Sequence, residues 1–181
     1  MSIKTLSDLV GLLNATSAKD FGGGGIDSAL DKVALDCDEL APFIFFREET
    51  YGRNLIARTK EFELLVLTWL PGQRTPIHNH DGQRCWMWMN SGTLTFKNYK
   101  PISLQGELVP TGSVETHSVG DLVYIDDGKG IHSIANASKK PAVSLHLYAG
   151  PVSRCRIYNE KIGHFEWVEL SYFTDPLSLA P

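Results

Sequence analysis

The sequence predicts an all-β dominated fold, an antiparallel barrel or sandwich with short N-terminal α-helices. Three observations predict it. Helical spacing of apolar residues is confined to the first part of the chain, short runs of β-branched and aromatic residues follow beyond Ile44, and 16 Gly and 9 Pro are spread along the 181 residues. A helical leader followed by closely spaced strands is typical of a barrel with its core inside.

The helical leader contains two short amphipathic patterns. Apolar residues recur at helical spacing from Leu6 to Leu13, and the glycines at 22–25 then interrupt the pattern. A second helix is predicted over Ile26–Leu40, where Asp27 or Ser28 provides the N-cap and apolar residues form one stripe.

The remaining chain alternates between strand-forming runs and turn residues such as those at 90–92. The predicted strands are Asn54–Arg58, Phe62–Leu70, Cys85–Asn90, Gly92–Tyr99, Glu107–Pro110, Leu122–Ile125, His132–Asn136, Ala142–Tyr148 and Arg154–Ile157.

The length fits a single domain over residues 1–181. Within it we expect a helical leader at 1–43, a β-barrel at 44–160 and a C-terminal extension at 161–181. We expect the chain to be a monomer.

Composition argues against several classes of partner. The net charge is −4 and Lys and Arg form no cluster, which argues against a nucleic acid or an anionic membrane. Three cysteines without a CxxC pair argue against a disulfide framework and fit a reducing compartment. Asp8 interrupts the first apolar stretch, which therefore resembles neither a signal peptide nor a membrane span. We expect a cytoplasmic protein.

Two histidines two residues apart, His78 and His80, are the first candidates for metal ligands. Residues two apart on an extended strand project to the same face, so both imidazoles can reach one point. The alternative is a polar surface strand on which two histidines coincide. The pair alone does not decide between these interpretations.

The segment around this pair, PGQRTPIHNHDGQRCWMWMNSG, matches the first cupin motif, with Cys85 at the usual position of Glu. A later segment, GDLVYIDDGKGIHSIAN, resembles the second cupin motif and contains His132. It departs from the common pattern, since Asp replaces the usual Pro and the glycine spacing is shifted. Together the two segments imply a cupin, which is a small antiparallel β-barrel or jelly roll.

Three further features narrow the resemblance. They are YGRNL at 51–55, SLHLY at 144–148, and Cys155. With Cys85 in place of Glu, they make the chain similar to the type I cysteine dioxygenases, which are iron(II) thiol dioxygenases on a cupin barrel.

The resemblance implies that His78, His80 and His132 bind Fe(II) as neutral imidazoles, which are suitable ligands for iron. The first motif's Glu would supply a carboxylate ligand, but Cys85 occupies that position. An incoming thiolate can then provide the negative charge, because coordination to a metal deprotonates a thiol.

The resemblance also implies that Arg53 binds the substrate carboxylate, with Tyr51 beside it. A planar guanidinium accepts a carboxylate through two hydrogen bonds, which a Lys cannot imitate. From position alone, Arg53 reads as an ordinary surface arginine, and the YGRNL context favours the binding role. Arg84 departs from mammalian-type members, which have His there. It either directs a second positive charge at the substrate or faces solvent, and we expect it to face solvent.

Tyr148 is expected near the iron, where it bonds the substrate carboxylate or an oxygen. Cys85 and Tyr148 correspond to the pair that forms a thioether crosslink in mammalian-type members. His146, next to Ser144, matches a relay that orients Tyr148. The alternatives are barrel packing for Tyr148 and a structural role for His146. Cys155 has either a structural role or a place at the pocket rim.

The implied function is oxidation of L-cysteine with O2 to cysteine sulfinic acid. One alternative is dioxygenation of another small thiol such as 3-mercaptopropionate, although that branch tends to carry Gln at the position of Arg53. Another is a metal-binding cupin without redox turnover. A third is a zinc or manganese cupin enzyme such as an isomerase, against which Cys85 counts because those sites usually keep the Glu.

Overall fold

The computed structural model describes residues 2–36, 38–80, 82–102, 107–126, 128 and 130–176. The helices are α1 (Leu6–Ala15), α2 (Ala18–Gly23), α3 (Asp27–Leu30) and the 3-10 helix η1 (Ala41–Phe43). The strands are β1 (Gly52–Arg58), β2 (Glu63–Trp69), β3 (Cys85–Ser91), β4 (Thr93–Pro101), β5 (Leu108–Ser118), β6 (Leu122–Ile125), β7 (Ile131–Ala135), β8 (Ala142–Tyr148), β9 (Arg154–Asn159) and β10 (His164–Glu169).

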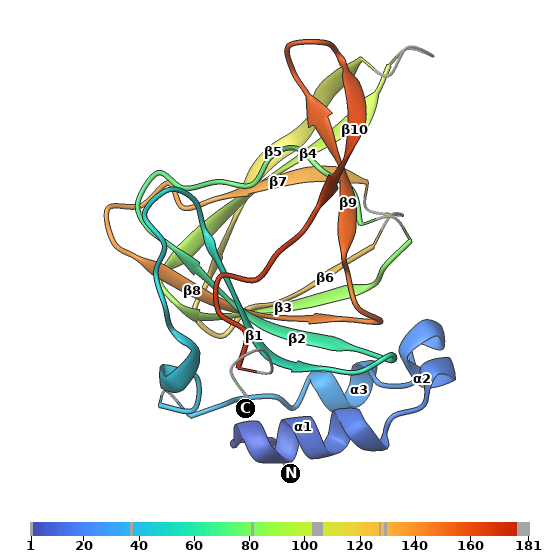
Figure 1. Ribbon diagram of the computed structural model, residues 1–181, viewed down its shortest axis with the longest axis vertical. Coiled ribbons are helices and arrows are strands. Elements are labelled where there is room, and N and C mark those ends of the chain that lie inside the picture. Colours follow the sequence, from blue (N-terminus) through green and yellow to red (C-terminus); the bar gives the residue numbers. More distant parts are fainter. Residues whose placement is uncertain are drawn as a thin grey trace.

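The strands form two antiparallel sheets and a hairpin, which confirms the predicted β-barrel architecture. One sheet has the order β1-β2-β8-β3-β6, the other has the order β5-β4-β7, and β9 pairs with β10. Strands distant in sequence, such as β2 and β8, are neighbours, as in a jelly roll. Figure 1 shows the sheets facing each other across the interior, with the helices beneath the larger sheet and the β9–β10 hairpin at the opposite end.

Both faces of the five-stranded sheet are covered. In β2, Leu64 and Val66 pack in a cluster with Leu9 and Leu13 of α1, whereas Leu65 belongs to the cluster inside the barrel. Every residue of β2 and of β8 is therefore buried. This explains why these strands read as nearly continuous apolar runs and do not alternate with polar residues.

The same alternation decides which side chains enter the barrel. In β8, Leu145 and Leu147 pack towards the helices. Successive residues of a strand point to opposite faces, so Ser144, His146 and Tyr148 face the interior. The polar residues of this strand are thus all on the inner face.

The second predicted helix is much shorter than expected. Only Asp27–Leu30 is α-helical, and α2 forms in the region that we expected to interrupt the helices. The reason is a tertiary pairing, because Ile3 and Val33 form a parallel bridge and Ala34 N–H donates to the Ile3 carbonyl at 2.9 Å. This pairing draws the chain after α3 into an extended conformation. Among the described residues, no helix has both the length and the apolar character to cross a membrane.

Two strands also differ from the prediction. β5 spans Leu108–Ser118, whereas the strand predicted there ended at Pro110. It is the edge strand of its sheet, where a missing backbone donor is tolerated. β10 was not predicted, and its residues are mostly exposed, so its sequence lacks the apolar alternation of a buried strand.

Candidate metal centre and substrate pocket

The three histidines of the two motifs meet at one point. Their ligand nitrogens all lie within 4.8 Å of one another, and they form a group that can hold a metal ion. His78 and His132 are joined by two backbone hydrogen bonds, from His78 N to His132 O at 2.9 Å and from His132 N to His78 O at 3.0 Å. His132 lies on β7, whereas His78 and His80 lie on the connection between β2 and β3 and not on a strand.

The hydrogen bonds of the imidazoles leave nitrogen lone pairs for a metal. The Nδ1–H of His78 donates to the carbonyl of Pro76 at 3.0 Å, which leaves Nε2 as the acceptor. Nε2 of His132 is buried and has no hydrogen-bond partner among the described residues. The His132 ring also forms a hydrogen bond with the backbone of Gly130. A buried, unpartnered ring nitrogen is expected where a metal ion binds.

Burial keeps these imidazoles neutral. It lowers the pKa of His78, and it lowers the pKa of His80 and His132 to well below their ordinary values, with a further contribution from the neighbouring imidazoles. Metal ligation requires the neutral ring. The donor set of three neutral imidazoles therefore fits a first-row metal ion such as iron.

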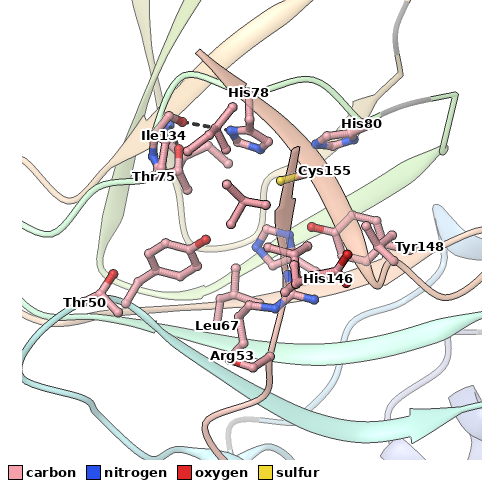
Figure 2. A pocket seen from close by; sticks show the side chains of 18 of the residues that line it. Thr50, Arg53, Leu67, Thr75, His78, His80, Ile134, His146, Tyr148 and Cys155 are labelled. Atoms are coloured by element: carbon pink, nitrogen blue, oxygen red, sulfur yellow. Dashed lines mark hydrogen bonds between the residues drawn. The ribbon is translucent and has the colours of Figure 1, made fainter. Parts of the chain in front are cut away.

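Two of the three imidazoles, those of His78 and His80, line a cavity of about 250 Å³ inside the barrel. Figure 2 shows His78 and His80 at one end, Arg53 at the other, and His146 and Tyr148 along one side. The cavity is also lined by residues beyond the barrel strands, including Leu170 and Ser171.

Arg53 is buried at the cavity end of β1 and is 8% exposed. Its Nη2 donates to Oε1 of Glu63 at 3.0 Å. Burial lowers the pKa of Arg53, but the neighbouring phenols and Glu63 outweigh this and raise it, so the guanidinium stays charged. Tyr51 lines the same cavity and stacks on Trp69, with ring centroids 4.9 Å apart and an interplanar angle of 16°.

Cys85 and Tyr148 are directly opposite each other on β3 and β8. Both are buried, and burial raises the pKa of the thiol and of the phenol, which are therefore protonated. The Tyr148 ring lies 5.8 Å from that of His80, between centroids. The structure thus places the two residues opposite each other, with Tyr148 beside His80.

His146 lies in a buried polar chain. Its Nε2 is 2.9 Å from Ser144 Oγ, which accepts a hydrogen bond from Trp69 Nε1 at 3.0 Å. Its Nδ1 lies 3.9 Å from Cys85 Sγ. Burial lowers the pKa of His146 to about 3, so the ring is neutral. This chain fixes the ring beside Tyr148, with which it stacks at 6.3 Å between centroids.

Arg84 does not face solvent, so that expectation was wrong. Its side chain is 17% exposed and donates to Tyr124 Oη and to the Phe21 carbonyl, both at 2.7 Å, and it pairs with Asp27. The arginine holds the N-terminal helices against the barrel, outside the cavity. Cys155 is buried and lines the cavity.

Three residues of the site were not identified from the sequence. Glu63 pairs with Arg53, Trp69 holds Ser144, and Tyr172 donates to Glu63 at 2.9 Å. The signal for Glu63 was present, since it is the one carboxylate in an apolar run that forms a central strand. A lone carboxylate in such a strand requires buried partners.

Comparison with solved structures shows the fold. A Klebsiella pneumoniae protein with a double-stranded β-helix domain superposes with a TM-score of 0.52 at 16% identity, covering 72% of this chain and 95% of that chain. The TT1209 protein of Thermus thermophilus superposes with a TM-score of 0.50 at 17% identity, covering 61% of this chain and 93% of that chain. The double-stranded β-helix is the cupin barrel that the two histidine motifs predicted.

Comparison with curated proteins shows to which family the chain belongs. Human cysteine dioxygenase type 1 is 30% identical over 173 residues, which cover 93% of this chain and 86% of the human protein. The zebrafish (Danio rerio) protein of the same name is 28% identical over 96% of this chain and 89% of its own length. Residues 3–161 match the family described as cysteine dioxygenase type I. Since this match spans both histidine segments, Arg53 and the SLHLY strand, the chain belongs to the cysteine dioxygenase type I family.

Proposed function

We propose that the protein is a non-haem iron thiol dioxygenase that oxidises L-cysteine with O2 to cysteine sulfinic acid. One observation carries the proposal: a cavity inside the barrel is lined at one end by His78 and His80, which group with His132, and at the other end by the charged Arg53 (Figure 2). The relatives that the chain matches over most of its length are named cysteine dioxygenases, which supports the same substrate.

We propose that His78, His80 and His132 hold Fe(II). Their ligand group contains no carboxylate or thiolate, so all three protein donors are neutral. Bound there, iron supplies a site for the substrate thiolate and for activation of O2. The two backbone hydrogen bonds between His78 and His132 hold these two ligands side by side, which fixes the position of the metal site.

Arg53 is proposed to bind the substrate carboxylate at the far end of the cavity. A charged guanidinium in a buried site makes strong, directional hydrogen bonds to a carboxylate. Tyr51 lines the cavity beside it, and its ring stacks on the buried Trp69. The substrate is thus held between the imidazoles and the arginine, and such orientation gives a large part of the rate advantage of an enzyme.

Tyr148 is proposed to donate a hydrogen bond to the substrate carboxylate or to a reacting oxygen. Its raised pKa keeps the hydroxyl protonated, and its position lies between the imidazoles and Arg53 (Figure 2). His146 is a positioning residue in this proposal, since it stacks on Tyr148 and is itself held by Ser144.

We also propose that Cys85 and Tyr148 form a thioether crosslink. The two residues are cross-strand partners, and side chains directly opposite each other on paired strands lie close enough to interact. Forming the C–S bond breaks the S–H bond of the thiol and one C–H bond of the phenol ring, and the two electrons and two protons reduce one O2 to hydrogen peroxide. Intact-protein mass spectrometry is expected to show a fraction of the protein lighter by two hydrogens. Fully active enzyme that keeps the free thiol and phenol throughout would exclude the crosslink.

A panel of thiols tests the substrate. We expect kcat/KM for L-cysteine to exceed that for cysteamine and for 3-mercaptopropionate by at least about tenfold, equivalent to about 1.4 kcal/mol. Cysteamine lacks the carboxylate that Arg53 binds, and 3-mercaptopropionate lacks the amine. The measurement is oxygen uptake by iron-loaded protein. A preference for 3-mercaptopropionate would contradict the cysteine assignment, and zinc-bound protein without oxygen uptake would favour a cupin of another function.

A further inference from the structure

Glu63 is a fully buried carboxylate at the start of β2, and its exposed fraction is 0%. Both of its oxygens accept hydrogen bonds. Oε1 accepts from Arg53 Nη2 at 3.0 Å, and Oε2 accepts from Tyr172 Oη at 2.9 Å and from the Val152 N–H at 3.2 Å. Burying a carboxylate is unfavourable unless it is paired and hydrogen-bonded, and this carboxylate is both.

The three donors come from three separate parts of the chain. Arg53 is on β1, Val152 lies between β8 and β9, and Tyr172 follows β10. The position of the carboxylate is therefore fixed from three directions. Tyr172 is itself held, because Arg58 donates to its hydroxyl at 3.1 Å. Burial and the bond to Glu63 raise the pKa of Tyr172 to about 12, which keeps the hydroxyl a donor.

Glu63 accepts hydrogen bonds from only some of the N–H groups of the Arg53 guanidinium. Nη2 of Arg53 is bonded to Glu63, whereas Nε is buried and has no hydrogen-bond partner among the described residues. Arg53 also lines the cavity that His78 and His80 line (Figure 2). A buried donor without a partner, beside a cavity, is placed to bond a ligand.

The backbone of Arg53 is fixed as well. Its carbonyl accepts a hydrogen bond from Phe173 N at 2.7 Å, and Leu55 N donates to the Thr174 carbonyl at 2.9 Å. The segment that carries Tyr172 thus lies along β1 and connects to Arg53 through both the backbone and Glu63. An arginine has several rotatable bonds, and ordering them before the ligand arrives reduces the entropic penalty of binding.

We propose that Glu63 is a positioning residue for the substrate carboxylate. It fixes the Arg53 fork so that the remaining N–H groups face the cavity, and it offsets the arginine charge, so that recognition depends on directed hydrogen bonds. This inference rests on the proposed function, because it takes a thiol with a carboxylate as the substrate.

The test is the Glu63→Gln variant, which keeps the size of the side chain and removes its charge. An amide has only one acceptor oxygen, so it cannot accept from Arg53 at one end and from Tyr172 and Val152 at the other, and the link that fixes Arg53 to the other two donors is broken. We expect KM for L-cysteine to rise about tenfold, the effect of losing one hydrogen bond to a charged group, with kcat changed by less than about threefold. For cysteamine, which has no carboxylate, both constants should stay within about twofold of wild type.

A matched control is Glu39→Gln. Glu39 accepts a hydrogen bond from Leu6 N at the start of α1 at 2.7 Å and does not line the cavity. We expect this variant to show wild-type constants for both thiols. The dissociation constant of L-cysteine, measured without O2 on iron-loaded protein, gives a readout that is independent of turnover and should weaken about tenfold in the Glu63 variant alone.

The Tyr172→Phe variant covers the case in which Glu63→Gln does not fold. It keeps the pair between Arg53 and Glu63 and removes one of the bonds that fix the carboxylate, so a rise in the cysteine KM of about threefold without effect on cysteamine is expected. Equal effects on both thiols, or none on either, would overturn the proposal. Wild-type protein that oxidises no thiol would refute the proposed function instead, so the two failures are distinguishable.

Discussion

Replacing His132 with alanine is expected to abolish iron binding and thiol oxidation together. The affinity for iron should fall by at least about a hundredfold, because even residues that only support a metal ligand contribute 10- to 100-fold. The iron content after reconstitution should fall accordingly. The fold should persist, since the bonds that join His132 to His78 are made by the backbone and not by the imidazole. The measurements are metal analysis, oxygen uptake and the unfolding midpoint.

His164→Ala is the matched control for this variant. His164 is exposed on β10, and its ring bonds only the nearby Ile162 carbonyl among the described contacts, at 3.2 Å. This variant should bind iron and consume oxygen as the wild type does. If His132→Ala retained iron and turnover, the three-histidine metal centre would be wrong, whatever the other variants showed.

Replacing Arg53 with alanine is expected to separate thiols that carry a carboxylate from thiols that do not. KM for L-cysteine should rise by about thirtyfold or more, since truncating one partner of a buried charged pair costs about 2–5 kcal/mol. KM for cysteamine should change by less than about threefold, because Arg53 has no group to bind there. A similar rise for both thiols would remove the proposed role of Arg53.

The same substitution leaves Glu63 buried without its arginine. Breaking a buried pair in this way destabilises a protein by about 3–5 kcal/mol. The double variant Arg53→Ala, Glu63→Gln removes the orphaned charge, so it should regain much of the unfolding midpoint. It should not regain the affinity for L-cysteine, which distinguishes loss of substrate binding from loss of stability.

The inward-facing part of the site was predictable from the sequence because strands alternate. Leu64 and Leu65 face opposite sides of the larger sheet, and the same rule places Ser144, His146 and Tyr148 together inside the barrel. The two histidine segments were recognisable by spacing, and the structure brings His78 and His132 together. Local pattern therefore singled out the residues that the structure groups, although His78 and His80 lie on the connection between β2 and β3 and not on the extended strand that we assumed for the pair.

Features that depend on distant pairing were not predictable from local pattern. The chain after α3 has a helical stripe, but the bridge from Ile3 to Val33 makes it extended. Arg84 reads as a solvent residue from its neighbours, and only the packing of the N-terminal helices supplies its partners. Glu63 finds Tyr172 from more than a hundred residues away, and no local signal links those two positions.

The most direct test of thiol dioxygenation is turnover of L-cysteine by iron-loaded protein under isotopically labelled dioxygen. We expect cysteine sulfinic acid in which both sulfinate oxygens come from O2, with one O2 consumed per cysteine oxidised and none above background in the His132→Ala variant. A product of cystine alone, or sulfinate that carries oxygen from water, would contradict the proposed function.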